Sequence, residues 1–202
     1  MNSRAKIAVF ISGGGTNLQS LIDATNSGKL SGEIVLVVSS KSNAYGLERA
    51  RNAGIDTFVF RKKDYPGSEE AEKDLLEMLE EYEVEYIALA GYLKLVPSPV
   101  VRRYKDRITN IHPALLPRYG GKGMYGHHVH EAVLASGDKE SGATVHLVDE
   151  IYDHGEIIIQ ERIPVMAGDT PDTLAARVLE VEHKIYPQAL ENLIQGRYAK
   201  DE

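Results

Sequence analysis

The chain has 202 residues, of which 43% are hydrophobic and 26% charged, a globular composition and a length that can bury a core without disulfides. Its 30 acidic residues outnumber its 23 Lys and Arg residues, and the net charge of -7 argues against nonspecific binding to nucleic acids or anionic membranes. Because the chain has no cysteine, disulfides, thiol nucleophiles and thiolate metal sites are excluded.

In the first half of the chain, the pattern predicts strands that alternate with helices. Short apolar runs predict buried strands at residues 6–12, 33–40, 56–60 and 86–90. Between them we expect helices, with Thr16 or Asn17 capping the first, Gly54 ending the second in a left-handed conformation, and the third at residues 69–82. This alternation predicts right-handed crossovers and a parallel sheet that binds ligands at the carboxyl ends of its strands.

The second half has a different pattern. We expect a fifth strand at residues 107–111, a helix at 129–136, strands at 143–148 and 156–164, and a last helix capped by Asp169 or Thr170 and reaching about Gln195. The fold class is therefore α/β, with a Rossmann-like parallel sheet in residues 1–110 and a mixed sheet in residues 111–202. No Pro/Gly-rich linker separates the halves, so we expect one domain over residues 1–202.

The first candidate site is the turn between the first strand and the first helix, which contains Gly13, Gly14, Gly15, Thr16 and Asn17. Glycines permit close approach to the backbone, and free N–H groups at a helix N-terminus suit a phosphate. A dinucleotide fingerprint is excluded because its third glycine is replaced here by Leu18, and no Walker A motif is present. A tight turn without a ligand is the alternative.

The second candidate site lies at the end of the fifth strand. Asn110 and His112 are two residues apart on an extended segment, so their side chains share a face. An amide beside an imidazole can stabilise an oxyanion and handle protons. Asp153, in a later loop, would raise the pKa of His112 and favour an imidazolium if the two met. A purely structural Asn-x-His pair and a turn-forming aspartate are the alternatives.

Other histidines and one acid complete the candidates. His127, His128 and His130 suggest a lid or ligand contact more than a metal site, since no pattern of further ligands accompanies them. His146 lies on an apolar strand, where a hydrogen-bonded core or supporting role is expected. For Glu182, an exposed helical acid is the default interpretation unless its helix packs beside the glycine turn.

Six segments together carry a resemblance to a known family: ISGGGTNLQSLID, GLERARNAGI, LAGYLKLV, NIHPALLP, GATVHLVDEIYDHGEIIIQ and RVLEVEHKIYP. The chain resembles the folate-dependent formyltransferases, and among them the phosphoribosylglycinamide formyltransferases. This resemblance implies a one-carbon group transferase of de novo purine (IMP) biosynthesis. It would move the formyl group of 10-formyltetrahydrofolate, its co-substrate, to the amine of 5'-phosphoribosylglycinamide without a metal.

The resemblance also implies roles for particular residues. Asn110, His112 and Asp153 match the catalytic trio, and His146 a supporting histidine at the folate. Residues 13–17 would hold the phosphate, and Glu182 the ribose. The remaining folate contacts would come from two loops: Leu93, Lys94, Leu95 and Val96, and Asp149, Glu150, Ile151 and Tyr152.

The chain departs from the family pattern at two places. Ser68 or Glu69 stands where the family has a folate-contacting arginine, so either Lys62 or Lys63 substitutes for it or the contact is absent. The loop at residues 119–126 is longer than in short members. Rival functions are another transferase or hydrolase that uses 10-formyltetrahydrofolate, and a non-catalytic nucleotide-binding module. We expect small-molecule substrates alone, no nucleic-acid or membrane partner, a monomer or homodimer, and a cytoplasmic location, since no signal peptide or membrane span is evident.

Overall fold

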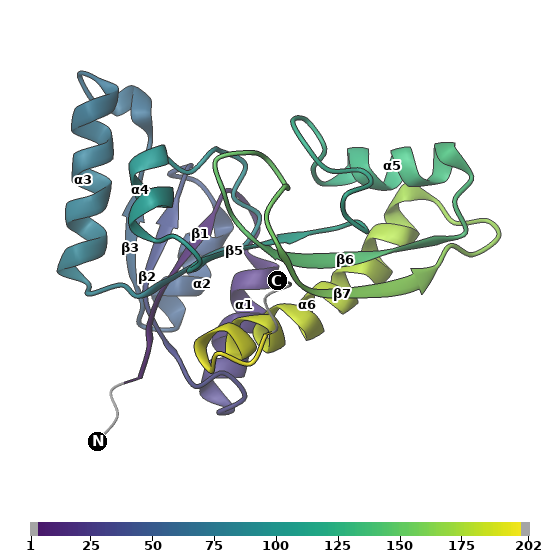
Figure 1. The fold of residues 1–202 in the computed structure, drawn as a ribbon, viewed down its shortest axis with the longest axis horizontal. Coiled ribbons are helices and arrows are strands. Elements are labelled where there is room, and N and C mark those ends of the chain that lie inside the picture. Colours follow the sequence, from purple (N-terminus) through teal and green to yellow (C-terminus); the bar gives the residue numbers. More distant parts are fainter. Residues whose placement is uncertain (1–3, 199–202) are drawn as a thin grey trace.

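The computed structural model describes residues 4–198, which form a seven-stranded sheet with helices on both faces (Figure 1). The strands are β1 (Lys6–Ile11), β2 (Glu33–Ser39), β3 (Asp56–Val59), β4 (Tyr86–Leu89), β5 (Ile108–His112), β6 (Glu140–Leu147) and β7 (Ile157–Pro164). The helices are α1 (Thr16–Asn26), α2 (Tyr45–Asn52), α3 (Ser68–Glu81), α4 (Ser98–Arg103), α5 (His127–Ser136) and α6 (Pro171–Ile194), with a 3-10 turn, η1, at Lys62–Asp64.

The strand order is β3-β2-β1-β4-β5-β6-β7. Strands β1 to β5 are parallel, whereas β6 pairs antiparallel with both β5 and β7. The expected α/β fold, parallel in the first half and mixed in the second, is therefore confirmed. The strand order reverses between β1 and β4, which is where sheets of this type form a ligand crevice.

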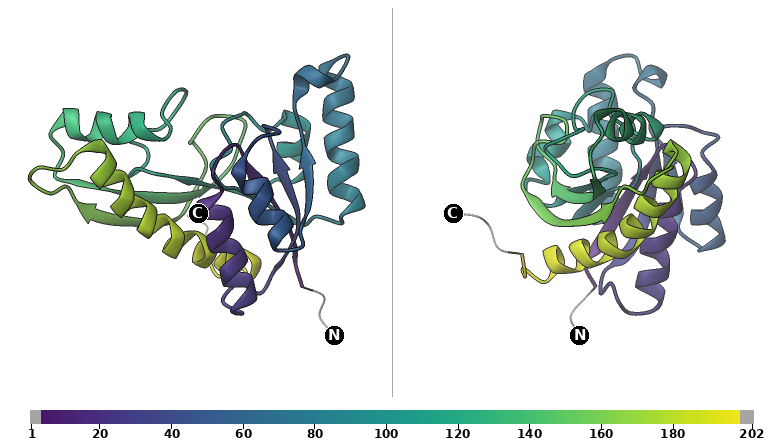
Figure 2. Two further views of the ribbon diagram at one scale, coloured as in Figure 1. Left: turned by 180° about the vertical axis from the view of Figure 1, so that it is seen from behind. Right: turned by 90° about the vertical axis from the view of Figure 1, so that its right-hand side faces the viewer.

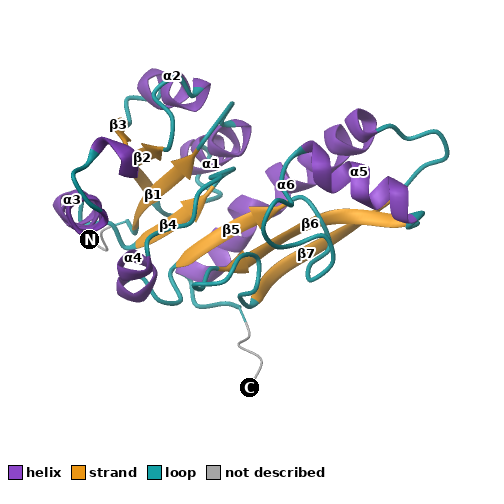
Figure 3. Cartoon of the chain, turned by 90° about the horizontal axis from the view of Figure 1, so that it is seen from above, coloured by secondary structure: helices purple, strands orange, loops and turns teal. Residues whose placement is uncertain are grey.

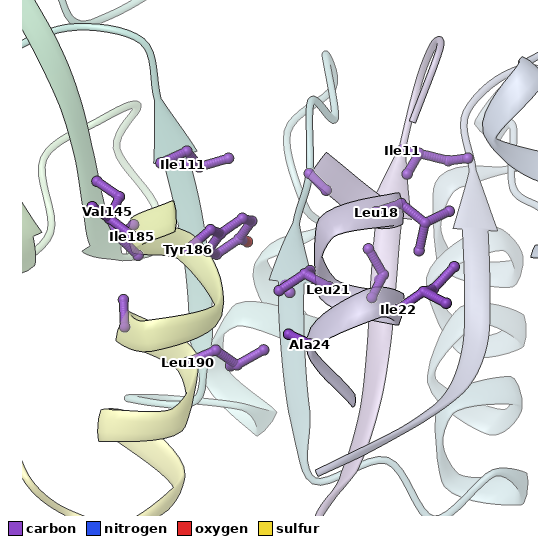
Figure 4. Packing of buried hydrophobic residues seen from close by; sticks show 14 of the residues in the cluster. Ile11, Leu18, Leu21, Ile22, Ala24, Ile111, Val145, Ile185, Tyr186 and Leu190 are labelled. Atoms are coloured by element: carbon purple, nitrogen blue, oxygen red, sulfur yellow. The ribbon is translucent and has the colours of Figure 1, made fainter. Parts of the chain in front are cut away.

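The two faces of the sheet are covered by different helices (Figure 3). Along β1, Ile7, Val9 and Ile11 belong to the core that contains α1 and α6 residues, while Ala8 and Phe10 belong to the core under α3 and α4. Because both faces are buried, the strand is a continuous apolar run instead of an alternating one. Figure 4 shows the first of these cores, with α1 packed over β1 and α6 packed against β5 and β6.

Helix α6 connects the two halves of the molecule. It begins with a capping box in which the Thr170 hydroxyl accepts from the Thr173 backbone N–H, as the sequence predicts for Thr170. From there it runs from α5 to α1 (Figure 2), and its residues contact β6, β7 and α1. The parallel and antiparallel parts of the sheet therefore share one long helix.

One local prediction is wrong, and one helix was not located. Neither Thr16 nor Asn17 caps α1, because Gly15 occupies the N-cap with φ of 72° and the Asn17 side chain bonds elsewhere. The bounds of helix α4 were not predicted, since its six residues are too few to show a helical period. Among residues 4–198, no helix is long and apolar enough to cross a membrane.

Candidate active site

The loops that follow β1, β2 and β4 meet at the carboxyl edge of the sheet. The Ser12 hydroxyl, directly after β1, lies 2.6 Å from the Ser40 hydroxyl and accepts the Leu93 backbone N–H at 2.8 Å. This one side chain ties three loops together at the point where the strand order reverses. The glycine turn and the segment at residues 93–96 are thus neighbours, as parallel strands require.

The glycine turn is open on one side. A Cβ atom built on Gly13 or Gly14 would meet nothing within 4 Å, so the backbone there is approachable by a ligand. The first turn of α1 follows immediately and offers N–H groups that have no intrahelical partner. This geometry suits a phosphate.

Glu182 is buried beside this turn, so the default interpretation of an exposed acid is wrong. Helix α6 packs against α1, and the Asn17 amide Nδ2 donates to Glu182 Oε2 at 2.6 Å. The Glu182 residue is only 7% exposed, and this burial raises its pKa to about 7 although the Asn17 bond opposes the shift. The structure therefore places a polar pair, Asn17 and Glu182, at the base of the turn.

The second candidate site is a cluster of four side chains from β5, β6 and the loop after β6. Asn110 and His146 face each other across the antiparallel pair, with Asn110 Nδ2 3.1 Å from His146 Nε2. Asn110 Nδ2 also donates to Asp153 Oδ1 at 3.3 Å. The same carboxylate oxygen lies 3.7 Å from His112 Nδ1 and 3.6 Å from His146 Nε2. The structure thus brings Asn110, His112 and Asp153 together.

Backbone groups complete this cluster, and nothing in the sequence indicated their contacts. His112 Nε2 lies 2.7 Å from the Tyr119 carbonyl, and the Gly121 N–H donates to Asp153 Oδ2 at 2.8 Å. His146 Nδ1 lies 2.7 Å from the Leu147 carbonyl, which leaves its Nε2 to accept from Asn110. Every residue carries backbone groups, so no residue type at Tyr119 or Gly121 could have signalled these contacts.

The loop that carries Asp153 is shaped by its glycine. Asp153 itself has φ of 53°, in the left-handed region. A Cβ atom at Gly155 would lie 1.9 Å from the Leu147 carbonyl oxygen, so only glycine lets the chain pass there. The D-x-G spacing therefore has a physical cause, because the close approach at Gly155 aims Asp153 back at β5.

The charge state of His112 differs from the expectation. Burial lowers the pKa of His112 more than the Asp153 carboxylate and the Tyr119 carbonyl raise it, because the side chain is 5% exposed. The imidazolium expected from sequence is therefore wrong for this state, in which the ring is neutral at pH 7. Burial also raises the pKa of Asp153, but its contacts with His146, His112 and the Gly121 N–H outweigh this and hold it below its usual range.

The segments expected to bind folate present apolar side chains to solvent. Leu93 is 44% exposed and Leu95 51%, while Val96 is buried in the core and Lys94 is exposed. In the loop after β6, Ile151 is 61% exposed and Tyr152 40%. Exposed large apolar side chains of this kind are typical of ligand surfaces.

The other two residues of that loop hold its shape. Asp149 Oδ2 lies 2.7 Å from His154 Nδ1, and Asp149 Oδ1 accepts the Ile151 N–H at 2.7 Å. Glu150 pairs with Arg102 at 3.1 Å. Lys62, a candidate substitute for the missing arginine, is paired with Glu72 of α3 at 3.0 Å.

The histidines of α5 do not converge. His127 pairs with Asp172 at 3.1 Å and His128 with Glu131 at 3.3 Å, both on the outside of the molecule. His130 is buried, and burial lowers its pKa to about 4. Within residues 4–198, no group of three His, Asp or Glu side chains is placed to hold a metal ion.

Comparisons with known proteins agree with this geometry. A family model described as formyl transferase matches residues 5–190. The chain is 48% identical over 195 residues to a chloroplastic phosphoribosylglycinamide formyltransferase of Vigna unguiculata. The match covers 96% of this chain and 62% of that protein, so this chain spans less than two thirds of the relative's length. It is 40% identical over 191 residues to the phosphoribosylglycinamide formyltransferase of Escherichia coli, covering 95% of this chain and 88% of that one.

Solved structures give the same result. The crystal structure of glycinamide ribonucleotide transformylase 1 from Symbiobacterium toebii superimposes with a TM-score of 0.92 at 39% identity, covering 100% of this chain and 92% of that one. The match runs through both halves of the sheet and so includes the glycine turn, β5 and the loop after β6. This chain belongs to the formyl transferase family.

Proposed function

We propose that this protein transfers the formyl group of 10-formyltetrahydrofolate to the amine of 5'-phosphoribosylglycinamide, a step of purine biosynthesis. The observation that carries the proposal is that Asn110 and His112 both lie next to one carboxylate oxygen of Asp153. Asn110 Nδ2 lies 3.3 Å and His112 Nδ1 3.7 Å from that oxygen, at the same sheet edge as the glycine turn. A protein that only binds nucleotides does not require this cluster of side chains. The relatives' names supply the acceptor substrate and the group transferred, and the family resemblance supplies the folate donor.

The two substrates approach from different loops. The phosphate binds the N–H groups of residues 13–17, and Glu182 accepts hydrogen bonds from the ribose hydroxyls in place of the one from Asn17. The apolar side chains of Leu93, Leu95, Ile151 and Tyr152 fit the flat ring of the folate, which is the co-substrate. The tetrahedral carbon then lies between these two surfaces, over Asn110 and His112.

Oxyanion stabilisation comes from N–H groups already present. As the amine nitrogen bonds to the formyl carbon, the carbonyl oxygen becomes an oxyanion and accepts from Asn110 Nδ2, replacing its 3.3 Å bond to Asp153. The neutral His112 ring donates Nε2–H to the same oxygen, in place of the Tyr119 carbonyl. His112 is buried and Asn110 half-buried before substrate arrives, so each donor exchanges one protein acceptor for the oxyanion at a site already largely screened from solvent.

Proton movement balances the transfer. The amine loses one proton as its bond to carbon forms, and His112 Nδ1, which faces the ionised Asp153 at 3.7 Å, takes it up. The carboxylate stabilises the imidazolium that results. The proton passes to the departing folate nitrogen as its bond to the formyl carbon breaks and the carbonyl re-forms.

The test is a turnover assay that follows the absorbance change on release of tetrahydrofolate. We expect turnover only when 5'-phosphoribosylglycinamide is present. Equal turnover with water alone would make the protein a hydrolase, and turnover with charged tRNA would make it a different transferase. We further propose one functional unit over residues 1–202, with a phosphate-binding half (1–110) and a folate-binding, catalytic half (111–202).

The net charge of -7 supports a protein without nucleic-acid or membrane partners. We propose that it acts in the cytoplasm on small molecules alone, without a metal, as a monomer or homodimer. Sedimentation of the purified protein distinguishes the last two.

A further inference from the structure

The segment at residues 46–55 has no role in the site described so far, yet it lies against the glycine turn. Helix α2 begins at Tyr45 beside α1 (Figure 3). The backbone N–H of Gly46 donates to the Gly13 carbonyl at 3.0 Å, and Arg49 Nε donates to the Gly14 carbonyl at 2.8 Å. Two consecutive carbonyls of the turn are thus held by one helix.

Close packing excludes a side chain from this contact. A Cβ atom at Gly15 would lie 2.7 Å from Gly46 Cα, and a Cβ atom at Gly46 would lie 2.5 Å from the Ile11 side chain. The first turn of α2 and the glycine turn therefore touch backbone to backbone. The spacing between Gly46 and Arg49 places both on one face of α2, since residues three apart on a helix are neighbours.

These bonds orient the donors of the turn. A carbonyl and the following N–H belong to one planar peptide unit and point in opposite directions. Because α2 holds the carbonyls of Gly13 and Gly14, the N–H groups of Gly14 and Gly15 point away from α2. Among residues 4–198, neither of these N–H groups has a hydrogen-bond acceptor, so both remain available to a ligand.

Arg49 is itself held in place. Its Nη1 donates to Gln19 Oε1 of α1 at 3.2 Å, and its guanidinium lies 5.1 Å from the centroid of the Tyr45 ring. A carbonyl that rotated toward a bound phosphate would repel it, and the Arg49 bond opposes that rotation. The guanidinium also adds a fixed positive charge next to the turn.

We propose that Arg49, together with the Gly46 N–H, is a positioning residue that confers specificity for a phosphorylated substrate by fixing the peptide orientation of the glycine turn. The proposal rests on the proposed function for the identity of that substrate. Arg49 touches neither the reacting atoms nor the folate surface. Its loss therefore affects recognition of the phosphate and not the chemical step.

The variant Arg49→Met keeps the length of the side chain and removes its donors. We expect the KM for 5'-phosphoribosylglycinamide to rise by ~10- to 100-fold, the cost of a lost charge-assisted hydrogen bond, with kcat and the folate KM within about twofold of wild type. The KM for the same substrate without its phosphate stays unchanged. Arg49→Lys, which retains a donor and the charge, recovers most of the selectivity.

Arg51→Met is the matched control, because Arg51 lies on the same helix, is 57% exposed in its side chain and pairs only with Glu48 within residues 4–198. It should match wild type in every parameter. Thermal unfolding of each variant reports whether folding is intact. The inference is overturned if Arg49→Met changes the KM for phosphorylated and unphosphorylated substrates by the same factor, or lowers kcat alone.

A readout without turnover separates this inference from the proposed function. We expect inorganic phosphate at millimolar concentration to raise the melting temperature of wild type and of Arg51→Met, and to raise that of Arg49→Met much less. If the turnover assay fails while this difference persists, the function falls and the positioning role stands. If turnover is found and phosphate protects all three proteins equally, the positioning role alone falls.

Discussion

Asn110 and His112 work as a pair because each has its own anchor behind it. His146 and Asp153 hold the Asn110 amide, and the Tyr119 carbonyl holds the His112 ring. These bonds hold the two side chains at one place until the substrate oxygen takes over their N–H groups, and removal of a single oxyanion donor is costly.

Replacing either donor should reduce turnover without unfolding the protein. We expect Asn110→Ala and His112→Ala each to lower kcat by ~10²- to 10³-fold, the usual effect of losing an oxyanion donor. Steady-state kinetics with both substrates, and circular dichroism melts, check this. His128→Ala serves as the control, because His128 is 65% exposed in its side chain and contacts Glu131 and the Tyr125 ring, neither of which belongs to the cluster. Near-wild-type turnover in either variant removes that residue from the mechanism.

Because Glu182 is buried, the stability of the folded protein depends on pH. Its folded pKa of about 7 lies above the ordinary value of 4.5, so the folded state binds the proton more tightly than the unfolded chain. Below pH 4.5 this carboxyl is protonated in both the folded and the unfolded chain, so burying it does not lower the free energy of unfolding through ionisation. The loss of stability grows between pH 4.5 and 7 and is complete above pH 7.

The variant Glu182→Gln should therefore be more stable than wild type above pH 7, by up to about 3 kcal/mol for a shift of this size. The difference should shrink toward zero as the pH falls to 4.5. Urea unfolding at several pH values measures it. A variant that is less stable at every pH would show that the bond to Asn17 outweighs desolvation. The KM for the ribonucleotide should rise, because an amide accepts fewer ribose hydrogen bonds than a carboxylate.

At the scale of elements, the sheet positions half of the site and a loop positions the other half. Strand period alone put Asn110 and His112 on one face, and Asn110 pairs with Leu89, the last residue of β4, so His112 lies beyond the end of that strand. Asp153 depends instead on the turn at Gly155, where a side chain would strike the Leu147 carbonyl. The loop is thus as important to the site as the strand.

The substitution Gly155→Ala should displace Asp153 and with it the anchor of His112. A Cβ atom 1.9 Å from a carbonyl oxygen forces the backbone apart, at ~1–3 kcal/mol for overpacking of this kind. A shift of about 1 Å at a reacting group can lower turnover by ~10²-fold. Melting temperature and kcat measure the two effects.

Gly67→Ala is the control for this experiment. There an added Cβ atom meets only the flexible carboxylate of Glu70, and φ is -155°, so any residue fits. Both stability and turnover should stay close to wild type. A Gly155→Ala enzyme with the kcat of wild type would show that the loop tolerates the side chain and that Asp153 is not aimed by it.

The elements themselves were largely predictable, and the failures have local causes. Apolar runs and helical spacing located all seven strands and five of the six α-helices of the described chain to within a few residues, because the core is built from these residues. The cap of α1 was wrong because Asn17 bonds to Glu182, 165 positions away in sequence. The charge state of His112 was wrong because burial is a tertiary property that no neighbour in the sequence reports.

For the whole molecule, the site requires both halves of the sheet. The sequence alone supplied the glycine turn and the Asn110–His112 pair, and it offered Asp153 as a carboxylate that could face His112. Only the family resemblance implied that the three meet, since strand pairing between β5 and β6 is not visible in a pattern. The bonds of the Tyr119 carbonyl, of the Gly121 N–H and of the glycine-turn carbonyls to α2 each have a backbone group as a partner. They follow from the path of the chain and could be found only in the structure.

Since one sheet and the shared helix α6 connect the two halves, we expect the chain to unfold in a single transition that ligands shift as a whole. A ligand at a hundred times its Kd stabilises the folded state by ~2.7 kcal/mol. For a chain of this size, ~1 kcal/mol shifts the melting temperature by ~2–4 °C, so saturating ribonucleotide should raise it by ~5–11 °C.

Scanning calorimetry with and without the ribonucleotide tests this, using the unphosphorylated ribosyl compound as the matched control ligand. The glycine turn lies in the first half, and Glu182 of α6 lies beside it. Helix α6 also packs on β6 and β7, so a ligand bound at the turn should stabilise these two strands as well. Two separate transitions, of which only one moves with the ligand, would mean that the halves fold independently and that the catalytic cluster forms at a joint between them.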